Sequence, residues 1–210
     1  MKLLVLGATG LTGRQLVAQA LDLGHEATAL VRDPRKLTVE HGQLRVLAGS
    51  STDSAAVDEA AGGQDAVLCA LGTRSPTSLV SCDLMRASMR AVVAAMERRE
   101  VGRLILLSAL GVGESARHAP PALRIAFRTL LRQVGRDKRA GEDHVRASDI
   151  DWTVVYPPSL TNGPRTGTYR SGEALELRGV PKISRADVAS FMLSQVADRT
   201  YSRRIAIVSP

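Results

Sequence analysis

The residues whose types and spacing best suit chemistry are three glycines near the start of the chain. Gly7, Gly10 and Gly13 follow an apolar run at residues 2–6 and precede a helical pattern at residues 14–23. A strand, a glycine-rich turn and a helix form the unit that binds a dinucleotide pyrophosphate. Gly7 permits a sharp turn, Gly10 opens the backbone to phosphate, and Gly13 allows close helix packing. We expect the first-turn amides to face the phosphates; the alternative is a plain strand-to-helix turn.

A basic cluster after the second expected strand bears on the choice of dinucleotide. At this point an acidic residue bonds the ribose 2′-hydroxyl of NAD, whereas an arginine accommodates the 2′-phosphate of NADP. Here Arg32 takes that place, and Arg35 and Lys36 follow it. The planar guanidinium fork suits a phosphate. The sequence therefore predicts NADP(H). The alternatives are a basic, solvent-exposed turn, or NAD held by Asp33 with Arg32 pointing away.

Further candidates fall where later strands are expected to end. A loop containing Ser50 would line the adenine, and Gly72 would permit close approach of the cofactor. Arg74 would contact phosphate or substrate. Ser108 would polarise a substrate carbonyl or orient the nicotinamide carboxamide. The alternative role of Ser108, which the sequence leaves equally open, is to cap the loop backbone.

The elements that must position these residues alternate between strand and helix patterns. Strands are expected at residues 2–6, 26–31, 44–47, 66–70, 103–108, 152–156 and 204–208, and helices at 11–23, 54–60, 80–100, 121–148 and 185–197. This alternation is typical of a parallel sheet covered on both faces. The sequence predicts one α/β domain over residues 1–210, with a Rossmann-type, doubly wound parallel sheet. Ligands bind such a sheet beyond the carboxyl ends of its strands.

Residues 157–183 have a different pattern, which indicates a small C-terminal flap. Pro157 and Pro158 end the sixth strand, and a turn cluster follows at residues 161–164. Residues 168–170 and 174–178 are expected to pair as a short hairpin. We predict that this segment covers the substrate; the alternative is an ordinary surface excursion.

Composition narrows the class of partner. The net charge of +7 raises the question of nucleic acid, but only 3% of the residues are aromatic, which leaves little capacity for base stacking. No run of residues approaches the length of a membrane span, and no signal peptide is expected. Two cysteines, Cys69 and Cys82, predict no disulfide framework, and Cys69 is expected to pack as a small hydrophobe. We expect a cytoplasmic monomer or weak homo-oligomer with small-molecule partners, and no metal, membrane or nucleic-acid site.

Several segments together resemble the atypical short-chain dehydrogenase/reductases, and within them the flavin reductase group that includes biliverdin reductase B. The resemblance covers nearly the whole chain and rests on residues 7–13, 30–33, 63–67, 71–74, 93–96, 108–109, 157–158 and 183–192. It implies NADPH-dependent reduction of flavins or related acceptors, namely tetrapyrroles or quinones. The flavin would be a substrate and not a prosthetic group.

The resemblance also implies roles for individual residues. It places Ser108 beside the nicotinamide, and we expect Ser108 and Ser159 to be the catalytic residues. It places Thr9, Gly10, Thr12 and Gly13 at the pyrophosphate, Arg32 and Lys36 at the 2′-phosphate, and Thr73, Arg74 and Met85 in the cofactor groove. With the other residues of the glycine turn and the strand ends, the full set expected to bind the cofactor is Gly7, Thr9, Gly10, Leu11, Thr12, Gly13, Arg32, Arg35, Lys36, Ser50, Leu71, Gly72, Thr73, Arg74, Met85 and Pro158.

Two departures from the family pattern affect the expected chemistry. Ser159 stands where the eukaryotic flavin and biliverdin reductases have histidine, and serine is not a pH-tuned acid near neutrality. This favours flavins over tetrapyrroles. The wider family uses Tyr-x-x-x-Lys, but Val134 stands four residues before Lys138. Tyr156 lies outside that spacing and is interpreted mainly as strand-end packing. The missing tyrosine keeps an alternative open: a redox sensor that binds NADP(H) without turnover.

A repeat of arginines has no role in the function predicted so far. Arg124, Arg128, Arg132 and Arg136 recur every fourth residue and would form one basic stripe on a helix. Like charges at this spacing cost about 0.2–0.5 kcal/mol per pair. An anionic substrate or partner would offset that cost. The alternative, which the sequence favours, is a solvated face balanced by acids on other elements.

Overall fold

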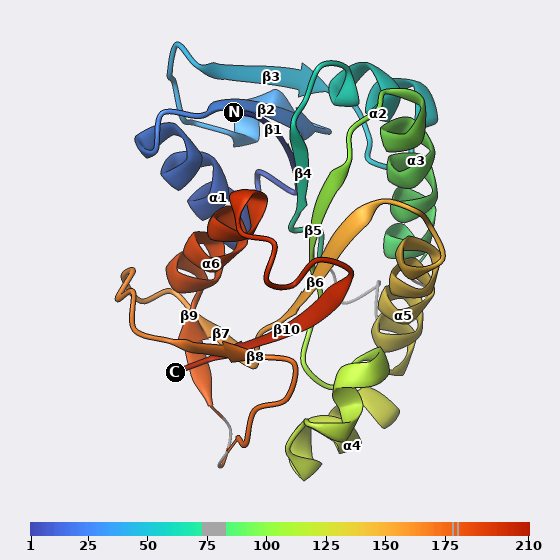
Figure 1. The fold of residues 1–210 in the computed structure, drawn as a ribbon, viewed down its shortest axis with the longest axis vertical. Helices are drawn as coiled ribbons and strands as arrows, with labels where there is room; N and C mark the ends of the chain where they lie inside the picture. Colours follow the sequence, from blue (N-terminus) through green and yellow to red (C-terminus); the bar gives the residue numbers. More distant parts are fainter. Residues whose placement is uncertain (73–82, 178, 180) are drawn as a thin grey trace.

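A single twisted sheet forms the centre of the molecule (Figure 1). The computed structural model describes residues 1–72, 83–177, 179 and 181–210. The strand order is β3-β2-β1-β4-β5-β6-β10-β8. The strands are β1 (Lys2–Leu6), β2 (Glu26–Val31), β3 (Leu44–Ala48), β4 (Ala66–Cys69), β5 (Arg103–Leu107), β6 (Asp151–Tyr156), β8 (Arg170–Gly172) and β10 (Arg204–Ser209). All neighbours are parallel except β8, which runs antiparallel to β10. The predicted α/β class and doubly wound sheet are confirmed.

Helices cover both faces of the sheet (Figure 1). Helices α1 (Leu11–Asp22) and α6 (Arg185–Ala197) pack together on one face, and α2 (Ser54–Ala61), α3 (Leu84–Arg98) and α5 (Arg132–Arg146) form the layer on the other. Among the described helices, none is long and apolar enough to cross a membrane.

The protein has two hydrophobic cores, one on each face of the sheet, because alternate side chains of each strand point to opposite faces. In β1, Leu4 and Leu6 pack beneath α3, whereas Leu3 and Val5 pack beneath α1 and α6. Cys69 is fully buried in the first of these cores, and burial raises the pKa of its thiol to about 11. The expectation that Cys69 packs as a small hydrophobe is confirmed, while Cys82 lies outside the described residues.

The helix expected over residues 121–148 is in fact two helices, so that prediction is wrong. Helix α4 (Pro121–Arg128) ends at Thr129, and α5 begins at Arg132. The Thr129 hydroxyl donates to the Ile125 carbonyl at 2.9 Å, and the Leu131 amide donates to the Ala126 carbonyl at 2.9 Å. These bonds close the last turn of α4 while the chain changes direction. Hydrophobic periodicity cannot reveal such a break, because both parts keep the helical period.

The C-terminal excursion pairs differently from the expected hairpin. Strand β8 adds to the edge of β10, with Gly172 opposite Ile207. Strands β7 (Ser159–Thr161) and β9 (Lys182–Ser184) form a separate parallel pair. The prediction that residues 168–170 pair with 174–178 is therefore wrong. Strand β8 instead satisfies the backbone groups on the open edge of β10.

Asp187 anchors this excursion to the start of α6. Its Oδ1 accepts from the amides of Thr166 at 2.7 Å and Gly167 at 2.9 Å, and its Oδ2 accepts from the Ser184 hydroxyl at 2.8 Å. Burial raises the pKa of the Asp187 carboxyl, but these bonds outweigh it and leave the pKa below its ordinary value. The excursion is thus tied to the start of α6 by a buried carboxylate, in addition to the pairing of β8 with β10.

Candidate functional site

The glycine turn has the geometry that its residue types predict. Gly7 has a φ of +82°, a conformation that other residues rarely adopt. The Gly10 amide donates to the Gly7 carbonyl at 2.8 Å and closes the turn. A Cβ on Gly13 would overlap the Gly7 carbonyl oxygen, and one on Gly7 would lie 2.6 Å from the Ala70 carbonyl oxygen. Helix α1 therefore packs directly against the turn.

The residues of this turn fit a dinucleotide pyrophosphate. A Cβ on Gly10 would meet only the Gly7 carbonyl oxygen within 4 Å, at 3.0 Å, so a ligand has room to approach. Helix α1 starts immediately afterwards, and the amides of Leu11, Thr12 and Gly13 have no acceptor one turn earlier in the helix. Amides and dipole together favour a phosphate here. Thr9 lies inside the same turn.

Arg14 links the two halves of this region, and the sequence reasoning missed it. Its Nε donates to the Thr9 carbonyl at 3.3 Å, and its guanidinium also donates to the Lys36 carbonyl at 2.7 Å. Arg14 thus holds the glycine turn against the basic turn after β2. Its position one residue after the third glycine was the available signal, but spacing alone does not show which carbonyls it reaches.

The charged residues of the basic turn at residues 32–36 differ in whether they have an ion-pair partner. Arg35 donates to Asp33 at 2.9 and 3.3 Å, and Lys36 Nζ lies 4.0 Å from the same carboxylate. The hydrogen bond from Arg35 lowers the pKa of Asp33. Arg32 is exposed and has no ion pair within the described ranges. Asp33 is therefore engaged locally, while Arg32 keeps an uncompensated charge.

Other predicted cofactor residues occupy varied positions. The Ser50 hydroxyl is used in a local turn with Thr52, at 2.9 Å between the hydroxyl oxygens. Leu71 is half-buried and Gly72 is exposed at the end of β4. Thr73 and Arg74 lie outside the described residues. Cofactor contacts by these residues stay predictions.

Met85 lies in the core between α3 and α5. Its side chain is only 3% exposed, and a Cβ on Gly141 would lie 2.7 Å from Met85 Cγ. The Met85 amide donates to Asp137 at 2.9 Å. Its predicted place on the cofactor groove also stays a prediction.

The carboxyl ends of β5 and β6 bring the two predicted catalytic serines into one region. The Ser108 amide donates to the Val155 carbonyl at 2.8 Å, and the Leu110 amide donates to the Pro157 carbonyl at 3.0 Å. These bonds continue the β5–β6 pairing past the strands. Pro158 is buried there, and half-buried Ser159 begins β7. The loop after Ser108 and the start of the excursion are thus held side by side.

A buried carboxyl completes this region. The Ser108 hydroxyl donates to Glu142 Oε1, and the Tyr156 hydroxyl donates to Oε2 at 2.6 Å. Glu142 is 2% exposed, and burial raises its pKa despite the two hydrogen bonds that favour the carboxylate. Burial, followed by the Glu142 charge, raises the pKa of Tyr156. We call these three residues the Ser108–Glu142–Tyr156 cluster.

Glu142 was missed in the sequence, and the hydroxyl of Tyr156 was assigned to packing. Tyr156 is indeed fully buried, but its hydroxyl also bonds the carboxyl. A signal was present, because Glu142 lies one helical turn after Lys138 and so faces the same side of α5. The family position that carries lysine is therefore followed by a second inward-facing ionisable residue.

Comparison with known proteins establishes the class. The model of an NAD(P)H-binding family matches residues 7–199. The chain therefore belongs to this NAD(P)H-binding family. The expectation of an NAD(P)H-binding protein is confirmed.

Individual relatives are more distant. The chain is 29% identical to a (4-alkanoyl-5-oxo-2,5-dihydrofuran-3-yl)methyl phosphate reductase of Streptomyces griseus, over 99% of this chain and 67% of that protein. It is 28% identical to an uncharacterized sugar epimerase, YhfK, of Bacillus subtilis, over 97% of this chain and 92% of that protein.

Solved structures share the fold. The anaerobillin reductase ChuY from Escherichia coli O157:H7 has a TM-score of 0.82 at 22% identity, covering 99% of this chain and 96% of its own. A short-chain dehydrogenase/reductase from Veillonella parvula DSM 2008, in complex with NADP, has a TM-score of 0.82 at 21% identity, covering 100% and 94%.

Proposed function

We propose that this protein is an NADPH-dependent reductase of flavins or related small acceptors, with flavin as a substrate. The observation that carries the proposal is the Ser108 hydroxyl, at the carboxyl end of β5, bonded to Glu142, a buried carboxyl whose pKa burial raises. That position lies on the same sheet edge as the glycine turn, where a ligand spans the strands. A hydroxyl backed by a carboxyl suits an acceptor that needs one proton with each hydride.

The cofactor would be held by residues already described. The glycine turn and the amides at the start of α1 would bind the pyrophosphate, and Arg32 would bind the 2′-phosphate. When bound, NADPH supplies a hydride from its nicotinamide. Asp33 would not compete for a ribose hydroxyl, because Arg35 engages its carboxylate.

Ser108 can take part in two ways, and Glu142 decides which. While Glu142 is ionised, Ser108 donates its proton to the carboxylate, so its lone pairs can accept an N–H group from a ligand. When Glu142 is protonated, the carboxyl donates to Ser108, and Ser108 can pass its own proton to the acceptor while it takes the Glu142 proton in its place. Glu142 then recovers a proton from solvent. The raised pKa of Glu142 favours the protonated state and hence this transfer.

Residues 157–183 would form the cover of the acceptor site. The segment starts at Pro157, next to the loop after Ser108, and is anchored at Asp187. A cover of this kind excludes water from the reacting atoms. We further propose a cytoplasmic location and a monomer or weak homo-oligomer. The buried, free Cys69 is consistent with a reducing compartment.

Turnover with a panel of acceptors tests the proposal. NADPH oxidation is followed with FMN, FAD, riboflavin, biliverdin and a quinone, and NADPH binding is measured on the same preparation. We expect turnover to be fastest with a flavin. Tight NADPH binding without oxidation by any acceptor would overturn the reductase proposal and support the redox sensor.

Cofactor choice gives a separate test at Arg32. Its charge-assisted hydrogen bond to a phosphate contributes about 1.5–3 kcal/mol, so Arg32→Ala should weaken NADPH binding roughly tenfold to a hundredfold and barely change NADH binding. The control is Arg45→Ala, an exposed arginine on β3 that pairs with Glu59. Equal affinities of the unmodified protein for NADPH and NADH would contradict the assignment.

A further inference from the structure

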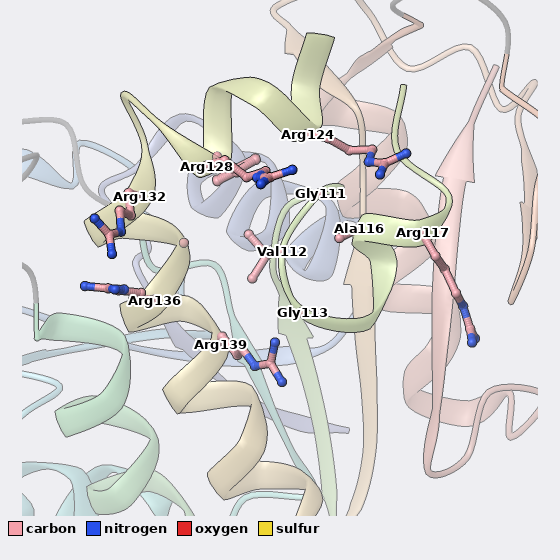
Figure 2. A pocket seen from close by; sticks show the side chains of 12 residues that line it. Gly111, Val112, Gly113, Ala116, Arg117, Arg124, Arg128, Arg132, Arg136 and Arg139 are labelled. Atoms are coloured by element: carbon pink, nitrogen blue, oxygen red, sulfur yellow. The ribbon is translucent and has the colours of Figure 1, made fainter. Parts of the chain in front are cut away.

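A cavity of about 610 Å³ lies between the loop after β5 and helices α4 and α5 (Figure 2). None of the described residues that line it is acidic. Six of them are arginines: Arg117, Arg124, Arg128, Arg132, Arg136 and Arg139. We call this space the arginine cavity. It contains the basic stripe that the sequence left without a role.

The arginines of this cavity differ in how their charge is balanced. Arg117 pairs with Glu114 at 2.9 Å, and Arg139 pairs with Asp143 at 3.6 Å. Arg124 and Arg128 have no ion pair in the part of the chain that the structure describes, and the same holds for Arg132 and Arg136. Concentrated positive charge in a concave wall raises the local concentration of anions. In the described part of the chain, these four arginines therefore lack the acidic partners that were expected from other elements.

The directions of the side chains single out two arginines. Figure 2 shows Arg124 and Arg128 projecting from α4 into the space beside the loop. Arg139 turns toward the loop from α5. Arg132 and Arg136 point to the other side of α5. Of the four lining arginines without an ion pair among the described residues, Arg124 and Arg128 are therefore the two that point toward the loop.

Phe127 adds an apolar wall to the same cavity. A Cβ on Gly111 would lie 2.9 Å from Phe127 Cδ2, and one on Gly135 would lie 3.2 Å from Phe127 Cδ1. The two glycines thus hold opposite edges of the ring, one from the loop and one from α5. A ring beside two free guanidinium groups suits a ligand that is apolar in one part and anionic in another.

The arginine cavity adjoins the proposed reaction centre. Gly113 lines the cavity, and a Cβ on it would lie 2.7 Å from Glu142 Oε2 and 3.6 Å from the Tyr156 hydroxyl. The loop that carries Gly113 begins directly after Ser108. An occupant of the cavity would therefore lie next to the Ser108–Glu142–Tyr156 cluster.

We propose that the arginine cavity binds the acidic group of the acceptor, so that the preferred substrate is a small anion bearing a phosphate or carboxylates. This inference rests on the proposed reductase function. The planar forks of Arg124 and Arg128 can each donate two hydrogen bonds to such a group. The acidic group would hold the substrate on the α4 side while its reducible part faces Ser108.

FMN and riboflavin provide the first test, because they share one ring system and differ by a phosphate. We expect the KM for FMN to lie at least about tenfold below that for riboflavin. The double variant Arg124→Gln/Arg128→Gln should raise the KM for FMN about tenfold or more and change that for riboflavin by less than about twofold. NADPH affinity should not change. The control Arg90→Gln removes an exposed arginine of α3 outside the cavity and should leave both KM values unchanged.

A second pair, biliverdin and its dimethyl ester, separates carboxylates from phosphate as the source of the charge. A lower KM for the charged member of either pair, with the difference lost in the double variant, supports the inference. The pair that shows it identifies the acidic group as phosphate or carboxylate. The absence of preference in both pairs overturns it.

Binding distinguishes failure of this inference from failure of the proposed function. FMN and riboflavin fluorescence is titrated with protein in the presence of NADP⁺, where no reduction occurs. Preferential FMN binding that depends on Arg124 and Arg128, without any turnover, would keep the anion site and reject the reductase. Turnover without charge preference would keep the reductase and reject the anion site. Circular dichroism of the double variant checks that it folds. Because Arg124 and Arg128 are exposed on α4, we expect an unchanged spectrum.

Discussion

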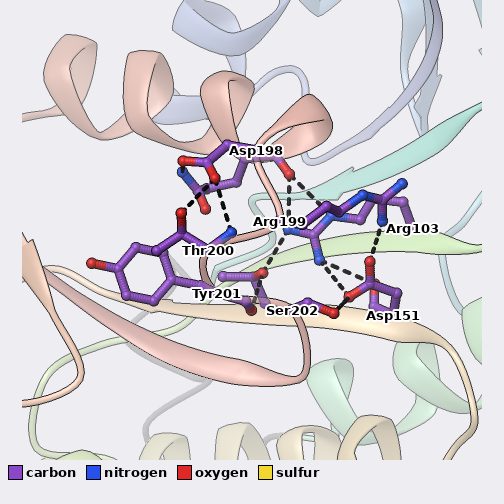
Figure 3. Close-up of polar contacts among 9 residues, drawn as sticks. Arg103, Asp151, Asp198, Arg199, Thr200, Tyr201 and Ser202 are labelled. Atoms are coloured by element: carbon purple, nitrogen blue, oxygen red, sulfur yellow. Dashed lines mark hydrogen bonds and ion pairs between the residues drawn. The ribbon is translucent and has the colours of Figure 1, made fainter.

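Two buried polar clusters lie at opposite ends of the same pair of strands. At the carboxyl ends of β5 and β6 is the Ser108–Glu142–Tyr156 cluster. At the amino ends, Arg103 and Asp151 are neighbours in register and bind one another at 3.0 Å. Figure 3 shows this second group, in which Arg199 and Ser202 also contact Asp151.

The amino-end cluster is balanced in charge and saturated with hydrogen bonds. The Arg103 side chain is 2% exposed and donates to the Gln195 carbonyl at 2.8 and 3.0 Å and to the Thr153 hydroxyl at 2.7 Å. Burial lowers the pKa of Arg103, and the Asp151 charge opposes that shift. These contacts join β5 to β6, and both strands to α6 or the turn that follows it. Such a cluster stabilises the fold and has no group free for a ligand.

The carboxyl-end cluster has a carboxyl whose direct partners are two hydroxyls. A hydroxyl neutralises no charge, so burial raises the pKa of Glu142 and lets it hold a proton. In both clusters burial shifts the pKa toward the uncharged form, but Arg103 keeps a carboxylate as its direct partner, whereas Glu142 has only hydroxyls as direct partners. A charged partner makes the group structural, and neutral hydroxyl partners make it able to exchange a proton.

Loss of Arg103 should produce the largest effect on stability. Arg103→Met removes a buried guanidinium that binds Asp151, Thr153 and the Gln195 carbonyl, while Asp151 keeps Arg199 and Ser202, so the loss should be about 1.5–3 kcal/mol. Urea unfolding should show this decrease, whereas the surface control Arg98→Met, which breaks one contact to Asp58, should cost no more than about 1 kcal/mol. NADPH affinity of the folded Arg103→Met protein should be unchanged. A stability loss equal to that of the control would refute the structural role.

Loss of the Ser108 hydroxyl should act mainly on the rate. If Ser108 passes the proton, Ser108→Ala should lower kcat with flavin by about a hundredfold, the lower end of general-acid effects. Its cost in unfolding free energy should be about 0.5–1.5 kcal/mol, that of one hydrogen bond. Ser202→Ala, which removes a hydroxyl from the other cluster, should have a similar stability cost and an unchanged kcat. Equal kcat values for the two variants would remove Ser108 from the reaction.

The smallest expected effect is a pH dependence of stability at Glu142. The folded chain raises this pKa above its ordinary value of 4.5. Below pH 4.5 Glu142 is protonated in both the folded and the unfolded chain. As the pH rises from 4.5 toward the folded pKa, the unfolded chain loses this proton first, so the free energy of unfolding falls. Glu142→Gln has no such proton, so its stability relative to the unmodified protein should improve between about pH 5 and pH 8. Urea midpoints at both pH values measure the difference, and a constant difference would mean that Glu142 is ionised when folded.

Elements governed by local pattern could be predicted closely. Strand β2 at Glu26–Val31 and helix α6 at Arg185–Ala197 have the expected bounds. Strand β2 is a short, mainly apolar run of the kind buried on both faces, and α6 is an apolar-rich segment that begins at a capping Ser184. The glycine turn was equally readable, because its three glycines are required by local backbone geometry and close approach.

Features that depend on distant partners could not be predicted. The division of 121–148 into α4 and α5, and the pairing of β8 with β10, arise from which edges and faces lie nearby after folding. The order of residues along the chain does not show which edges and faces become neighbours. The arginine stripe was visible, but the cavity around Arg124 and Arg128 needs the loop after β5 as its opposite wall.

The sequence by itself determined the strand–turn–helix that identifies an NAD(P)H-binding chain, because that unit is local and its residue types are dictated by backbone geometry. Only the tertiary structure decided what surrounds the acceptor. Ser108 and Glu142 lie 34 positions apart, on a strand end and a helix. Their contact exists because α5 packs beside the carboxyl ends of β5 and β6, and the burial that raises the Glu142 pKa is a property of that packing alone.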